Sequence, residues 1–111
     1  MTLILAYQER NKTFDLVIND AADAAITPGV NDLVRISIGR EGEVAKLTVT
    51  SGTDTANGSS VTKGATNRVR LDAQDLDFEP GTYTLFVDYF DTADSSEWKN
   101  VSRQVFALED T

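Results

Sequence analysis

Short runs in which apolar and polar residues alternate restrict this chain to β-structure. In the clearest run every second residue is apolar: Tyr83, Leu85, Val87 and Tyr89. A period of two places these side chains on one face of a strand, whereas a helix needs apolar residues three or four positions apart. The same alternation recurs in residues 14–18, 34–38, 45–49 and 69–71. No segment sustains a helical period, so we predict an all-β fold.

Turn-forming dipeptides separate these runs: Asn19-Asp20, Pro28-Gly29, Glu41-Gly42, Asn57-Gly58, Lys63-Gly64 and Pro80-Gly81. Glu41-Gly42 joins two strand patterns closely enough to form a β-hairpin. Seven to eight short strands divided by turns predict an antiparallel β-sandwich. The 111 residues form one domain, 1–111. Residues 1–7 are expected to be a strand or arm, and residues 51–66 a mobile loop with a weak strand at 59–61.

The core of such a sandwich follows from the inward-facing positions of the strands. In the last run, residues 98–108, the apolar residues switch from one set of alternate positions to the other. One extra residue in a strand has this effect, so we predict a β-bulge near residues 102–104. The expected core residues are Phe14, Leu16, Ile36, Ile38, Leu47, Val69, Leu71, Tyr83, Leu85 and Val87.

The net charge of −8 excludes several classes of partner. Binding to a duplex requires a basic face that displaces counterions from phosphates, and anionic membranes make the same demand. No apolar run approaches the length of a membrane span, and no basic segment followed by an apolar one marks a signal peptide. We therefore expect no nucleic acid, no membrane and no secretion. The acidity either keeps the domain soluble or faces a basic partner surface.

The sequence offers little that could perform catalysis. It contains neither histidine nor cysteine, which removes the commonest general base and the usual ligands of transition metals. Two carboxylate clusters could in principle hold calcium, but neither has the spacing of an EF-hand. They comprise Asp72, Asp75, Asp77 and Glu79, and Asp91, Asp94 and Glu97. We predict that the chain is not an enzyme and has no catalytic residue, cofactor or metal ion.

Residues 71–83 predict a particular kind of corner between two strands. Pro80 and Gly81 turn the chain into the strand that begins near Tyr83. This pattern suggests the tyrosine corner of immunoglobulin-like sandwiches, in which a tyrosine hydroxyl binds upstream backbone. Asp75 is expected to accept hydrogen bonds from backbone amides there, and Leu76 to fill the core.

The order of these segments resembles a family of phage immunoglobulin-like domains, the N-terminal domain of phage baseplate upper proteins. The matching segments are residues 14–18, 34–38, 71–83 and 104–108. The family's closing strand often begins with glycine, which is absent here, and a long receptor-binding or fibre region usually follows the family's domain. Because this chain ends at Thr111, the resemblance suggests an accessory role rather than that of an adhesive fibre.

The resemblance implies a virion structural protein of a tailed bacteriophage, assembled in the host cytoplasm. We expect a capsid decoration or cement protein that binds the major capsid protein. A tail or baseplate accessory that binds tail proteins is the first alternative, and homo-oligomers remain open. A carbohydrate-binding or adhesion module is the second, because aromatic side chains can stack on sugars; the candidates are Tyr7, Tyr83, Tyr89 and Trp98.

Two apolar groups are candidates for the attachment surface. Leu3, Ile4 and Leu5 are consecutive, so this strand is either buried on both faces or meets a neighbouring subunit. Phe86 and Phe90 lie opposite the core stripe of their strand and could form an apolar patch. The alternative is that residues 51–66 cover them.

Overall fold

A computed structural model describes residues 3–19, 22–91 and 97–110. This part of the chain is all-β, with 54% of its residues in strands and no helix. Within these residues, therefore, no helix has the length and apolar character needed to cross a membrane.

The described residues form ten strands, two or three more than expected, because the chain adds a small hairpin between two longer strands. In chain order they are β1 (Leu3–Tyr7), β2 (Lys12–Leu16), β3 (Ile18–Asn19), β4 (Ala25–Ile26), β5 (Leu33–Gly39), β6 (Leu47–Thr50), β7 (Ser60–Thr62), β8 (Asn67–Leu71), β9 (Gly81–Phe90) and β10 (Lys99–Glu109).

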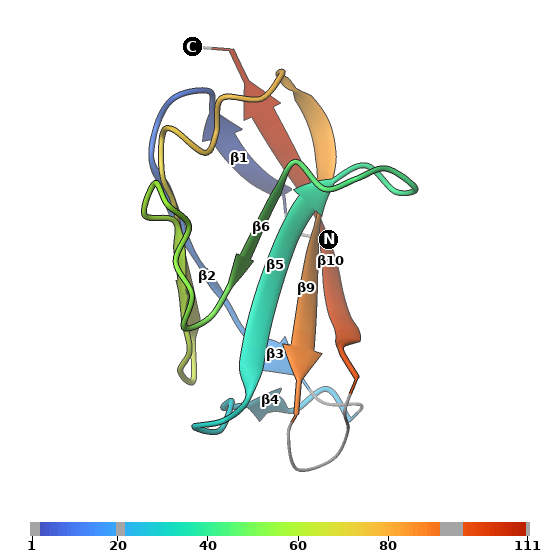
Figure 1. The fold of residues 1–111 in the computed structure, drawn as a ribbon. Coiled ribbons are helices and arrows are strands. Elements are labelled where there is room, and N and C mark those ends of the chain that lie inside the picture. Colours follow the sequence, from blue (N-terminus) through green and yellow to red (C-terminus); the bar gives the residue numbers. More distant parts are fainter. Residues whose placement is uncertain (1–2, 20–21, 92–96, 111) are drawn as a thin grey trace.

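The strands form two main sheets that face each other (Figure 1). One has the order β1-β10-β9-β5-β6 and the other β2-β8-β7, while β3 and β4 pair separately. The predicted hairpin across Glu41-Gly42 is present as the antiparallel pair β5 and β6. The sheets are mostly antiparallel, as expected, and the exception among the described residues is β1, which runs parallel to β10. These two strands lie at opposite ends of the sequence, so no hairpin constrains their direction.

Residues from both main sheets fill one shared core. Eight of the ten expected core residues are buried, including Ile36, Leu71 and Leu85. Phe14 and Leu47 are only half-buried against the core, because they lie on β2 and β6, the edge strands of their sheets.

Strand β1 has one buried and one exposed face. Ile4 and Ala6 enter the core, whereas Leu3, Leu5 and Tyr7 point outward from the sheet. The alternative of a strand buried on both faces is therefore wrong. Since β1 is an edge strand, one side of its backbone also has no neighbouring strand in the sheet.

Strand β10 contains the irregularity that its sequence predicts. The pairing with β9 shifts register between Asn100 and Ser102, slightly before the expected position at residues 102–104. Beyond the shift, Phe106 and Leu108 face the core and Val105 faces outward. The bulge thus explains why the apolar residues of this run do not follow a single alternation.

Residues 51–66 contain more structure than the expected loop. The weak strand predicted at residues 59–61 is present as β7, one residue later, and it pairs with β8. The mobility of the preceding turns stays a prediction. Residues 22–24 lead into β4, which begins at Ala25.

Neighbouring substitutions in β10 can test which face is buried. Replacing Phe106 by Ala should lower the free energy of unfolding by about 3–5 kcal/mol, because a fully buried aromatic ring is lost. The matched change Val105→Ala on the half-buried outer face should cost much less. Urea denaturation measures both, and similar costs would contradict the described facing of β10.

Candidate functional site

Residues 72–80 connect β8 to β9 and form the predicted tyrosine corner. The Tyr83 hydroxyl donates a hydrogen bond to the carbonyl oxygen of Glu79 at 2.6 Å. The Phe78 ring meets Tyr83 edge-on, with ring centroids 5.1 Å apart. Arg40 lies over the Tyr83 ring at 4.5 Å and forms an ion pair with Glu79 at 3.2 Å. Pro80 lies exposed before Gly81, where β9 begins.

The turn between β1 and β2 is bonded to the same corner. The Glu9 amide donates to the carbonyl oxygen of Leu76 at 3.0 Å, and the Gln8 side chain donates to that of Phe78 at 2.9 Å. Leu76 itself is fully buried, as the sequence predicts. The corner therefore receives hydrogen bonds from a turn more than sixty residues away in the sequence.

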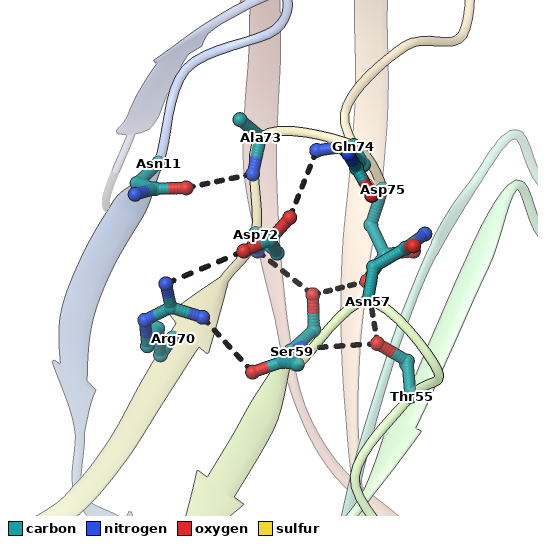
Figure 2. A network of polar contacts seen from close by, with 10 residues as sticks. Asn11, Thr55, Asn57, Ser59, Arg70, Asp72, Ala73, Gln74 and Asp75 are labelled. Atoms are coloured by element: carbon teal, nitrogen blue, oxygen red, sulfur yellow. Dashed lines mark hydrogen bonds and ion pairs between the residues drawn. The ribbon is translucent and has the colours of Figure 1, made fainter.

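Asp75 binds a second distant segment, the loop before β7 (Figure 2). Its carboxylate accepts a hydrogen bond from the Thr55 hydroxyl at 2.6 Å and another from the Asn57 side-chain amide at 2.8 Å. The Ser59 hydroxyl donates a third. The expectation that Asp75 binds backbone amides is therefore corrected, because its described donors are side chains. We call Thr55, Asn57, Ser59 and Asp75 the Asp75 clamp.

Neighbouring polar groups orient the members of the clamp. The buried Ser59 hydroxyl accepts the Asp72 amide at 2.8 Å, and the Ser59 amide donates to the Thr55 hydroxyl at 3.0 Å. Arg70 donates to the Gly58 carbonyl at 2.9 Å and to the Asp72 carboxylate at 3.3 Å (Figure 2). Most polar groups of the loop are therefore hydrogen-bonded to other groups of the same domain, as is typical of a structural network.

The environment of Asp75 lowers the pKa of its carboxyl below the ordinary value of 3.8. Burial, the largest single influence, raises this pKa, but the hydrogen bonds from Ser59, Thr55 and Asn57 together outweigh it. Asp75 is thus held as an anion at neutral pH, which suits an acceptor of three bonds.

The described part of the chain shows no group of three or more carboxylates arranged to hold a metal ion. A shallow depression beside the corner is lined by Glu9, Asn57, Ala73, Gln74 and Asp77. Asp94, from the second carboxylate cluster, lies outside the described residues.

A second polar cluster forms near β4, and no pattern in the sequence indicates it beyond the Lys63-Gly64 turn. The Lys63 ammonium donates to three backbone carbonyls, those of Gly29, Val30 and Asp32, at 2.9, 3.1 and 2.6 Å. The Asp32 carboxylate accepts from the Tyr89 hydroxyl at 2.6 Å. Burial and this acidic neighbour raise the pKa of Tyr89. The cluster joins the loop before β5 to the turn after β7 and to β9.

Phe86 and Phe90, the second candidate surface, are half-buried. The described contacts to their rings come from Arg103 and Trp98, and none comes from residues 51–66, which were the expected cover. Arg103 lies over the Phe86 ring at 5.2 Å. The Trp98 ring lies 5.5 Å from that of Phe90, and Arg35 covers Trp98 at 4.1 Å. Arginine side chains of the same sheet and Trp98, which precedes β10, thus partly shield both phenylalanines.

The outward side of β1 is the more exposed of the two candidate surfaces. Leu3 is 60% exposed, Tyr7 46% and Leu5 37%. We call these three residues the β1 face. Ile4, the remaining candidate of this segment, lies in the core. Of the five candidate interface residues, Ile4 is thus in the core, Leu3 and Leu5 are exposed on β1, and Phe86 and Phe90 are half-buried on β9.

The aromatic residues considered for stacking on sugars are mostly occupied. Tyr83 and Tyr89 are buried, and Trp98 contacts Arg35 and Phe90. Tyr7 is the most exposed of the four. A sugar platform usually needs a free aromatic face, so these contacts count against the carbohydrate-binding alternative.

Comparison with known proteins identified no relative: no protein-family model matches the sequence, and no curated protein shows significant similarity to it.

The depressed pKa of Asp75 makes the contribution of the clamp dependent on pH. Asp75→Ala should lower the free energy of unfolding by about 1.5–3 kcal/mol at pH 7, the range for bonds to a charged group. Because the folded pKa lies below the unfolded one, this contribution is present above about pH 4 and is lost as the pH falls through the folded pKa. Urea denaturation of both proteins between pH 7 and pH 2.5 measures the difference. A difference that stays constant down to the lowest pH would contradict an ionised clamp.

Proposed function

We propose that the two sheets form an immunoglobulin-like sandwich of the variable type. The order β2-β8-β7 against β10-β9-β5-β6 corresponds to strands B-E-D against G-F-C-C′ of that fold. The bond from Tyr83 to Glu79 lies at the start of β9, where the tyrosine corner of strand F is expected. Two features of antibody domains are missing, since the chain has no cysteine and Trp98 lies outside β5.

On this fold, we propose a non-enzymatic binding domain that attaches to other proteins through the β1 face. The observation that carries this proposal is the row of exposed Leu3, Leu5 and Tyr7 on an edge strand. Exposed apolar residues in a row are typical of interaction surfaces, and an open strand edge adds backbone donors and acceptors. The sequence has neither histidine nor cysteine, two of the residues that most often perform acid–base or nucleophilic catalysis.

The proposed setting is the virion of a tailed bacteriophage, where the chain decorates or cements the capsid shell. Support comes from the resemblance to phage immunoglobulin-like domains, a likeness of fold rather than of site. The net charge of −8 suits a shell surface with apolar residues and a basic rim. A tail or baseplate position would use the same surface on a different partner.

Serine substitutions can test the β1 face. The double variant Leu3→Ser and Leu5→Ser should lose most co-sedimentation with phage particles that lack this chain, because its apolar contact area is removed. Val30 and Val44 are 91% and 89% exposed outside the β1 face, so Val30→Ser with Val44→Ser is the matched control and should bind normally. Circular dichroism verifies that both variants fold. Normal binding by a folded Leu3/Leu5 variant would exclude the β1 face as the attachment surface.

A further inference from the structure

The loop of the Asp75 clamp contains the single Asn-Gly pair of the sequence, Asn57-Gly58. An asparagine followed by glycine is the dipeptide most prone to deamidation, because glycine has no side chain to hinder its own amide nitrogen. That nitrogen attacks the side-chain carbonyl carbon of the asparagine. Asn57 is exposed and lies in a turn, so water can reach its side chain.

Both residues of this pair have structural roles. Asn57 donates its side-chain amide to the Asp75 carboxylate at 2.8 Å. Gly58 has φ of +100°, a conformation that residues with side chains rarely adopt. Replacing Asn57 or Gly58 by another residue would therefore weaken the loop. This gives a physical reason for a chemically labile pair at this position.

The folded loop also restrains the groups that would react. The Gly58 amide, the nucleophile, donates to the carbonyl oxygen of Thr55 at 2.9 Å. The Asn57 carboxamide, which carries the leaving group, is held by Asp75. Reaction requires that both hydrogen bonds open, so the rate depends on how often the loop leaves the clamp.

We infer that Asn57 is a site of spontaneous deamidation whose rate is set by the Asp75 clamp. The Gly58 nitrogen forms a bond to Cγ of Asn57, and the side-chain nitrogen leaves as ammonia, which gives a five-membered succinimide. Water then adds to either carbonyl and opens the ring to aspartate or isoaspartate. No electrons are transferred, and water is the only co-reactant.

The product reverses the interaction that holds the loop. A carboxylate at position 57 no longer donates to Asp75 but repels it, and isoaspartate also lengthens the backbone by one carbon. The loop of residues 55–59 should then separate from the corner, while the Tyr83 bond to Glu79 remains. Deamidation thus acts as an irreversible release of this loop as the protein ages.

Peptide mapping by mass spectrometry tests this inference on the intact chain incubated at pH 8.5 and 37 °C. Asn57 should gain the mass of deamidation well before Asn11 and Asn100, which precede Lys12 and Val101. Asp75→Ala should accelerate the reaction at Asn57 by about tenfold or more, since it removes three bonds that keep the loop closed. Thr55→Val should accelerate it through the same loop, and it is the substitute if Asp75→Ala does not fold.

Two controls separate loop opening from other effects. Asp15→Ala removes an equal charge from an exposed ion pair with Arg68, and Ile36→Val lowers global stability without touching the loop. Neither should change the rate at Asn57 by more than about twofold. If Asn57 deamidates no faster than Asn11 or Asn100, the inference that Asn57 is a deamidation site is wrong. Equal rates of deamidation at Asn57 in Asp75→Ala and Asp15→Ala would contradict the inference that the Asp75 clamp sets this rate.

Discussion

Residues 72–80 carry the chain from β8 in one main sheet to β9 in the other, and several other segments are hydrogen-bonded to them. Tyr83 ties the end of this segment at Glu79, the turn after β1 binds Leu76 and Phe78, and the loop before β7 binds Asp75. Buried backbone groups at such a crossing must find partners, because an unmade hydrogen bond is costly in the core. The corner meets this requirement with a donor from the nearby Tyr83 and with donors from the distant turn after β1.

This arrangement gives the corner a structural role and leaves the β1 face for the proposed binding role. At the corner, the polar side chains mostly bind one another, so they hold the fold together rather than offer a site. Along β1, by contrast, Leu3 and Leu5 remain exposed although their neighbours Ile4 and Ala6 complete the core. The corner keeps β1 in place through Glu9 and Gln8, and this would present the β1 face as a rigid surface for the proposed partner.

Much of the fold could be predicted from periodicity, and what could not depended on distant contacts. Alternation located β5, β8 and β9 and eight of ten core residues, because burial on one face leaves a period of two. The parallel pairing of β1 with β10 could not be predicted, since no local signal couples the two ends of a chain. The tyrosine corner was recognisable because its residues are close in sequence. The true donors to Asp75 lie 16 to 20 residues away, so only the structure reveals them.

The dependence of the fold on its corner is tested most directly by the free energy of unfolding of Tyr83→Phe, which removes only the hydroxyl that binds Glu79. The bond is neutral and part-buried, so we expect a loss of about 1 kcal/mol in urea denaturation, with the transition still cooperative. An unchanged free energy of unfolding would contradict a corner that holds the two sheets together.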